Sequence, residues 1–113
     1  MKTLIIWSMA GLLLGSGLLW TPAPALAQSG QDIFNQHCAM CHGTDGRGNG
    51  PAAAALNPPP ADFNTAAFWQ NTSRAQITET IEDGRGQMPA FNFSPSQIKA
   101  VIDYMHRTFR PGR

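Results

Sequence analysis

The chain has 113 residues, a formal net charge of +1 and only two cysteines. Residues 28–113 carry seven basic and seven acidic side chains, which argues against a nucleic acid or an anionic membrane as the main partner. A domain of this size buries a thin core, and such domains usually need a covalent staple or a prosthetic group.

The N-terminus has the pattern of a secretory signal. A short basic start, Met1-Lys2, precedes residues 3–20, which are apolar apart from two serines. Two prolines and then Ala25-Leu26-Ala27 follow, which fits the small-x-small rule for signal cleavage. We therefore predict a signal peptide over residues 1–27 and an exported, periplasmic bacterial domain over residues 28–113, with no stable membrane span after cleavage. The alternative is an uncleaved anchor, because about 17 apolar residues lie at the lower limit for a span.

The first expected helix runs from Asp32 to Met40. Ile33, Phe34 and His37 fall on one stripe at helical spacing, so Phe34 is expected to pack inward. His37 could in principle bind a metal ion, but we interpret it as a histidine on the helix surface.

Both cysteines lie in the run Cys38-Ala39-Met40-Cys41-His42. A C-x-x-C-H run is the attachment signature of a c-type haem, in which two thiols form thioethers and the adjacent imidazole takes the iron. We therefore predict one haem c, covalently attached through Cys38 and Cys41, with His42 as the proximal iron ligand. A zinc site would crowd four donors into six residues, and a thiol oxidoreductase would need strands that the sequence does not predict.

Residues 43–60 are rich in glycine and proline and are expected to wrap the proximal side of the haem. A ligating histidine normally donates its second ring N–H to a carbonyl. We expect this acceptor in the Gly50-Pro51 turn or in Pro58 to Pro60. A short helix is possible from Thr65 to Trp69. The aromatic side chains expected to wall the pocket are Phe63, Phe68 and Trp69.

Two capping boxes predict two further helices. Ser73-Arg74-Ala75-Gln76 opens a helix that carries Ile77 and Ile81 and stops at Gly84. Ser94-Pro95-Ser96-Gln97 opens the last helix. Its apolar stripe consists of Ile98, Val101, Ile102, Met105 and Phe109.

The loop between these two helices contains Met88, with glycines before it and a proline after it. Of the three methionines beyond residue 27, Met40 lies between the cysteines and Met105 lies on the last apolar stripe. We therefore predict Met88 as the distal iron ligand. The alternative is a bis-histidine site that uses His106.

The residues resemble the class I cytochrome c family. The resemblance rests on Gly30, Ile33-Phe34, the haem motif with Gly43, the loop rich in glycine and proline, Met88-Pro89 and Tyr104. It implies an all-α cytochrome c fold, with three to four helices wrapped around one covalently attached haem. It also implies a Phe34–Tyr104 contact where the first and last helices cross, low-spin His/Met iron and one-electron transfer.

The preferred functional interpretation is a monomeric periplasmic electron-transfer protein that cycles its iron between Fe(II) and Fe(III) and meets redox proteins transiently. Because both axial positions would be filled, we expect no enzyme activity. One alternative is a haem c subunit of a larger oxidoreductase complex. Another is a five-coordinate haem catalyst or gas sensor, which would apply if Met88 does not bind the iron.

Overall fold

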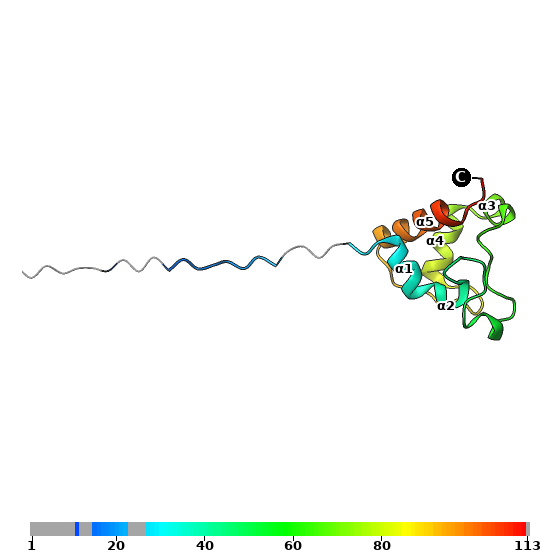
Figure 1. Cartoon of the computed structure of the whole chain (residues 1–113), viewed down its shortest axis with the longest axis horizontal. Helices are drawn as coiled ribbons and strands as arrows, with labels where there is room; N and C mark the ends of the chain where they lie inside the picture. Colours follow the sequence, from blue (N-terminus) through cyan, green and yellow to red (C-terminus); the bar gives the residue numbers. More distant parts are fainter. Residues whose placement is uncertain (1–10, 12–14, 23–26, 113) are drawn as a thin grey trace, which may run out of the picture.

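The computed structural model describes residues 11, 15–22 and 27–112. A helical domain follows an N-terminal segment that leads away from it (Figure 1). The described part of the chain contains helices, turns and loops but no strand, so the all-α prediction is confirmed. None of the described helices is long and apolar enough to cross a membrane. Most of the predicted signal peptide, including Ala25 and Leu26 of its cleavage site, lies outside the described residues.

The first predicted helix is divided into α1 (Gly30–His37) and α2 (Ala39–His42). The Ser29 side chain accepts a hydrogen bond from the Asp32 N–H, so α1 begins two residues earlier than expected. Cys38 separates the two helices. Its N–H donates to the Phe34 carbonyl at the end of α1, and its own carbonyl accepts from the His42 N–H at 2.9 Å. The first cysteine is therefore fixed by its backbone at a helix junction.

The remaining elements are the 3₁₀ helix η1 (Ala53–Ala55), α3 (Ala66–Asn71), α4 (Arg74–Asp83) and α5 (Pro95–Phe109). Both predicted capping boxes are present, because Ser73 and Ser94 each exchange hydrogen bonds with the glutamine three residues later. Gly84 ends α4, as its pattern predicts. The described residues thus form five α-helices in place of three to four, since the break at Cys38 divides one helix into two.

The core lies where α1 crosses α5. Ile33, Phe34, Val101 and Ile102 are at most 2% exposed. The Phe34 and Tyr104 rings lie 5.7 Å apart, which confirms the contact that the family resemblance implies. The two helices lie side by side in Figure 1. Their backbones can approach closely because the residue at the crossing point has no side chain.

That residue is Gly30. A Cβ atom there would collide with the Ala100 carbonyl and would lie 2.9 Å from Tyr104 Cβ. Opposite charges also join α5 to α4, since Asp103 on α5 lies 2.6 Å from Arg74 on α4. Within α5, Lys99 lies 2.7 Å from Asp103. The hydrogen bond from Lys99 is the main cause that lowers the pKa of Asp103. Desolvation opposes it, and the hydrogen bond from Arg74 adds to the lowering.

We predict that Gly30→Ala destabilises the domain by about 1–3 kcal/mol, because the added methyl group pushes α5 away from α1. Urea unfolding followed by circular dichroism measures the effect. Gln31→Ala is the matched control, since Gln31 is exposed on the same helix and alanine favours helices. A Gly30→Ala protein at least as stable as the parent would contradict the proposed close approach.

Candidate functional site

Cys38 lies directly before α2, and Cys41 lies within this helix, three residues later. Both thiols are free and half-buried. Burial raises the pKa of Cys38 to about 11, and the neighbouring Cys41 adds to the increase. The Cys38 sulfur therefore keeps its proton at neutral pH. Met40, between the two, is 61% exposed, so its side chain points away from the core.

The His42 imidazole is held on one side by a backbone carbonyl. Its Nδ1 donates to the Ala61 oxygen at 3.2 Å, which leaves Nε2 available. The ring stacks on Phe63 with 4.5 Å between centroids. Burial is the main cause that lowers the His42 pKa, while the Ala61 bond opposes it. The lowered pKa favours the neutral ring, which can offer a lone pair to a metal. The predicted acceptor, at Gly50-Pro51 or Pro58 to Pro60, is wrong because the chain reaches the ring one residue later.

Glycines bring the loop over residues 43–61 against α2. The Gly48 N–H donates to the His42 carbonyl at 2.7 Å, and the Gly50 N–H donates to the Cys41 carbonyl at 3.0 Å. A Cβ at Gly48 would collide with the Pro60 carbonyl, next to Ala61. Close approach, rather than flexibility, explains the glycines here. Through them the loop folds back to place Ala61 beside His42.

Phe63 is the centre of the predicted aromatic wall and is 5% exposed. Its ring meets Phe68 edge-on at 4.9 Å and Phe34 at 6.3 Å. The Trp69 indole N–H donates to the Phe63 carbonyl at 2.8 Å, which fixes both residues. The wall therefore connects the core of α1 with the back of the His42 ring.

Met88 lies in a tight turn after α4. Arg85 and Met88 exchange two backbone hydrogen bonds, each 3.0 Å long. The backbone of Gly84, at φ +74°, makes room for this turn, because a Cβ there would lie 2.8 Å from the Met88 carbonyl. The Phe91 N–H then donates to the Ile81 carbonyl at 2.8 Å, which fixes the loop to α4. Met88 is half-buried and packs against the core.

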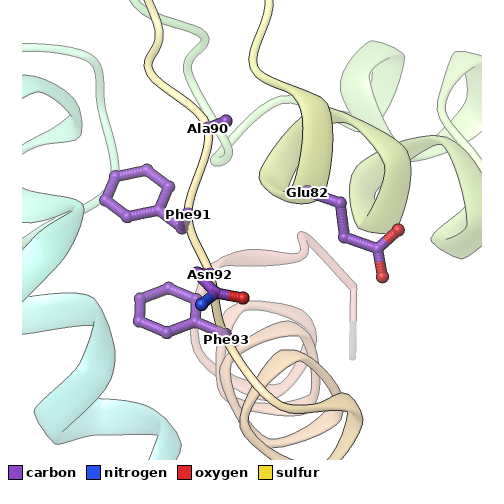
Figure 2. Close-up of a pocket in the computed structure, with 5 residues that line it drawn as sticks. All are labelled: Glu82, Ala90, Phe91, Asn92 and Phe93. Atoms are coloured by element: carbon purple, nitrogen blue, oxygen red, sulfur yellow. The ribbon is translucent and has the colours of Figure 1, made fainter.

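A surface hollow of about 350 Å³ lies beyond Met88, lined by Glu82 and residues 90–93. Figure 2 shows Glu82 on one side of this segment and the rings of Phe91 and Phe93 on the other. The two rings stack, and His37 contacts both edge-on from the end of α1. None of the predicted ligands lines the hollow, so it is separate from the candidate site.

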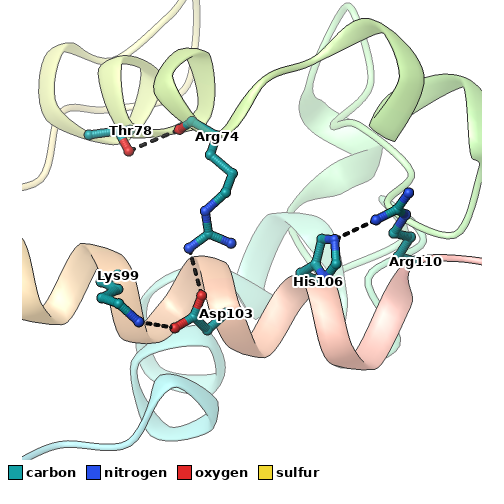
Figure 3. A network of polar contacts seen from close by, with 6 residues as sticks. All are labelled: Arg74, Thr78, Lys99, Asp103, His106 and Arg110. Atoms are coloured by element: carbon teal, nitrogen blue, oxygen red, sulfur yellow. Dashed lines mark hydrogen bonds and ion pairs between the residues drawn. The ribbon is translucent and has the colours of Figure 1, made fainter. Parts of the chain in front are cut away.

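His106 is engaged elsewhere. Its Nε2 accepts a hydrogen bond from Arg110 at 2.7 Å (Figure 3). The centroid of its ring lies 5.4 Å from that of Trp69. The nitrogen that would bind iron in a bis-histidine site therefore already has a donor. Figure 3 also shows that His106 lies one turn of α5 beyond Asp103, in the part of the helix that follows the α4 contact.

The four donors fit a haem better than a bare metal ion. The described residues contain no group of three or more histidine, cysteine or acidic side chains that could hold an ion. They do offer two free thiols on one helical turn, an oriented imidazole and a thioether on a separate loop. Thioether tethers with His and Met axial ligands are the donor set of cytochromes c.

The family model described as "Cytochrome C oxidase, cbb3-type, subunit III" matches residues 25–105. Among curated relatives, the cbb3-type cytochrome c oxidase subunit FixP of Azorhizobium caulinodans is 36% identical over 89 residues, covering 76% of this chain and 27% of its own. Subunit CcoP of Cereibacter sphaeroides is 34% identical over 85 residues, covering 73% and 27%. The chain thus spans about a quarter of the length of the curated relatives that it matches.

Solved structures show the same fold. KustC0563, a c-type cytochrome, has a TM-score of 0.59 at 26% identity over 72% of this chain and 98% of its own. Cytochrome c6C from Synechococcus sp. PCC 7002 has a TM-score of 0.56 at 27% identity, covering 73% and 95%. These similarities confirm the predicted cytochrome c fold and the haem c cofactor.

One expectation needs correction. Our expectation that both axial positions are filled predicts no enzyme, yet the curated relatives are named as subunits of cytochrome c oxidase, which is an enzyme complex. The prediction is wrong because it treats the domain in isolation, whereas an electron-transfer component takes part in the reaction of its whole complex. The chain belongs to the family of c-type cytochrome domains described as cbb3-type cytochrome c oxidase subunit III.

Proposed function

We propose that this chain is the haem c electron-transfer component of a larger oxidoreductase complex related to the cbb3-type oxidases. The match to the subunit III family over residues 25–105 is the observation that carries this proposal. Electron transfer is common to this function and to a free carrier. The complex is favoured because the named relatives are oxidase subunits.

The proposed cofactor is one haem c, bound through Cys38 and Cys41. When bound, its iron takes up and releases a single electron. The half-buried cysteines support this attachment, because Cys38 caps the start of α2 and Cys41 lies within it, so one short element holds both tethers. His42 follows directly on the same helix, where Ala61 fixes the ring orientation. A carbonyl partner of this kind also raises the basicity of the ligating nitrogen.

Met88 is the proposed distal ligand. It is half-buried, and two backbone hydrogen bonds with Arg85 close its turn. These bonds fix the backbone from which the Met88 side chain extends. A thioether ligand stabilises the ferrous state and raises the reduction potential. The engagement of His106 with Arg110 supports Met88 over a second histidine.

The surface around the tethers supports a lasting partner. Residues 48–61 contain no charged side chain, and Pro51 and Ala54 are exposed. The Ala52 N–H donates to the Met40 carbonyl at 2.9 Å, which brings this uncharged loop to the backbone of Met40, a residue whose side chain is exposed. Apolar surface is enriched at the centres of stable interfaces. We propose that another redox subunit covers this face.

We also propose that the domain acts on the periplasmic side of a bacterial membrane. Leu18, Leu19 and Trp20 are 88–93% exposed, so the domain gives their apolar side chains no cover. Such an apolar segment is typical of a signal peptide or a membrane anchor. An exported location also permits cysteine oxidation.

Replacing both Cys38 and Cys41 by alanine should make the haem fully extractable into acidified organic solvent, because no thioether remains. Each single variant should keep one tether and retain its haem. The measurement compares the haem left on the denatured chains of the three variants. Covalent haem on the double variant would show that other residues carry the attachment.

Met88→Ala should lower the reduction potential and remove the weak far-red absorption band of methionine-ligated ferric iron, because a thioether ligand is lost. Met40→Ala is the matched control, since Met40 is exposed between the tethers and should leave both readings unchanged. Redox titration with optical detection measures them. If Met88→Ala behaves as the control does, another residue is the distal ligand.

Purification from the membranes of its source bacterium should recover a tagged form of the full chain together with a terminal oxidase in fixed stoichiometry. An unrelated exported c-type cytochrome with the same tag serves as the control. Gel filtration in mild detergent, with haem and oxidase activity followed in the same fractions, gives the measurement. Recovery of the tagged chain alone, at the size of a monomer, would favour the free carrier instead.

A further inference from the structure

Two separate loops support the two proposed iron ligands. The first, residues 43–61, presents the Ala61 carbonyl to His42, and the second, residues 84–91, carries Met88. Within the described residues, one hydrogen bond joins these loops. The Asn57 N–H donates to the side-chain oxygen of Gln87, Oε1, at 2.8 Å.

The bond is made at the tip of the Met88 turn. Gly86 has a φ of +57°, which allows the chain to reverse between Arg85 and Met88. Because the backbone groups of Met88 and Arg85 bond to each other, the turn is internally closed. The Gln87 side chain is the group by which this closed turn reaches another part of the chain.

The base of the loop is already fixed to α4. The Gly84 N–H donates to the Thr80 carbonyl, and the Phe91 N–H donates to the Ile81 carbonyl. Residues 85–87 at the tip are exposed, so little packing restrains them. A turn that is rigid inside and fixed at its base moves chiefly by swinging its tip. The bond between Gln87 and Asn57 opposes that swing.

We propose that Gln87 is a positioning residue that holds the Met88 turn closed and so limits how often Met88 leaves the iron. The inference rests on the proposed ligation by Met88. A foreign ligand can bind the iron only in the open form, so its apparent affinity rises in proportion to the open fraction. Gln87 therefore controls access of small molecules to the distal side.

Titration of the ferric holoprotein with imidazole tests this inference. Gln87→Leu keeps the bulk but loses the acceptor, and it should raise the apparent imidazole affinity by about threefold to tenfold, as expected for one lost hydrogen bond. Gln87→Glu keeps an acceptor oxygen at the same reach and should stay close to the parent. Gln70→Leu, at an exposed position on α3, is the matched control for a surface glutamine.

The outcomes separate this inference from the function on which it rests. If Met88→Ala raises the imidazole affinity and Gln87→Leu does not, Met88 is a ligand but Gln87 does not hold it. If Met88→Ala leaves the affinity unchanged, the ligation itself fails and the inference fails with it. Urea unfolding of each variant measures global stability. An affinity gain that Gln70→Leu or Gln87→Glu shares would also overturn the role of Gln87, since it would not depend on the acceptor.

Discussion

The crossing of α1 and α5 determines where the two cysteines and His42 lie. At Gly30 the backbones approach so closely that a methyl group would meet the Ala100 carbonyl, and Phe34 is then enclosed beneath Tyr104. Because α1 ends at Cys38, this packing fixes the start of the turn that carries both cysteines and His42. Burial of a few large side chains thus helps to position the tethers.

The two halves of the proposed haem site are held by different means. His42 lies on a helix and is oriented by a carbonyl from a loop that glycines bring close, whereas Met88 lies in a short turn that is fixed mainly at its base. The proximal loop is bonded along its length to three successive residues, 40–42, whereas the distal loop is bonded to α4 only at its two ends. Because of this asymmetry, a single exposed side chain such as Gln87 can affect how often the Met88 turn opens.

Local signals in the sequence were sufficient for the helices but not for contacts between loops. The capping boxes at Ser73 and Ser94 and the apolar stripe of α5 are short-range patterns, and the structure contains both. The choice of Ala61 depends on how the loop folds back, which no local pattern specifies. The contact from Gln87 to Asn57 joins residues 30 positions apart, and an exposed glutamine carries no signal of its partner.

The absence of charge between residues 48 and 61 has a consequence for how the domain meets its partner. A segment without charged side chains neither attracts nor repels another protein over the Debye length, so residues 48–61 add no electrostatic steering of their own. Electron delivery through it would be nearly insensitive to ionic strength, and its speed would depend on local concentration. A domain confined beside its partner within one assembly meets that requirement without any long-range attraction.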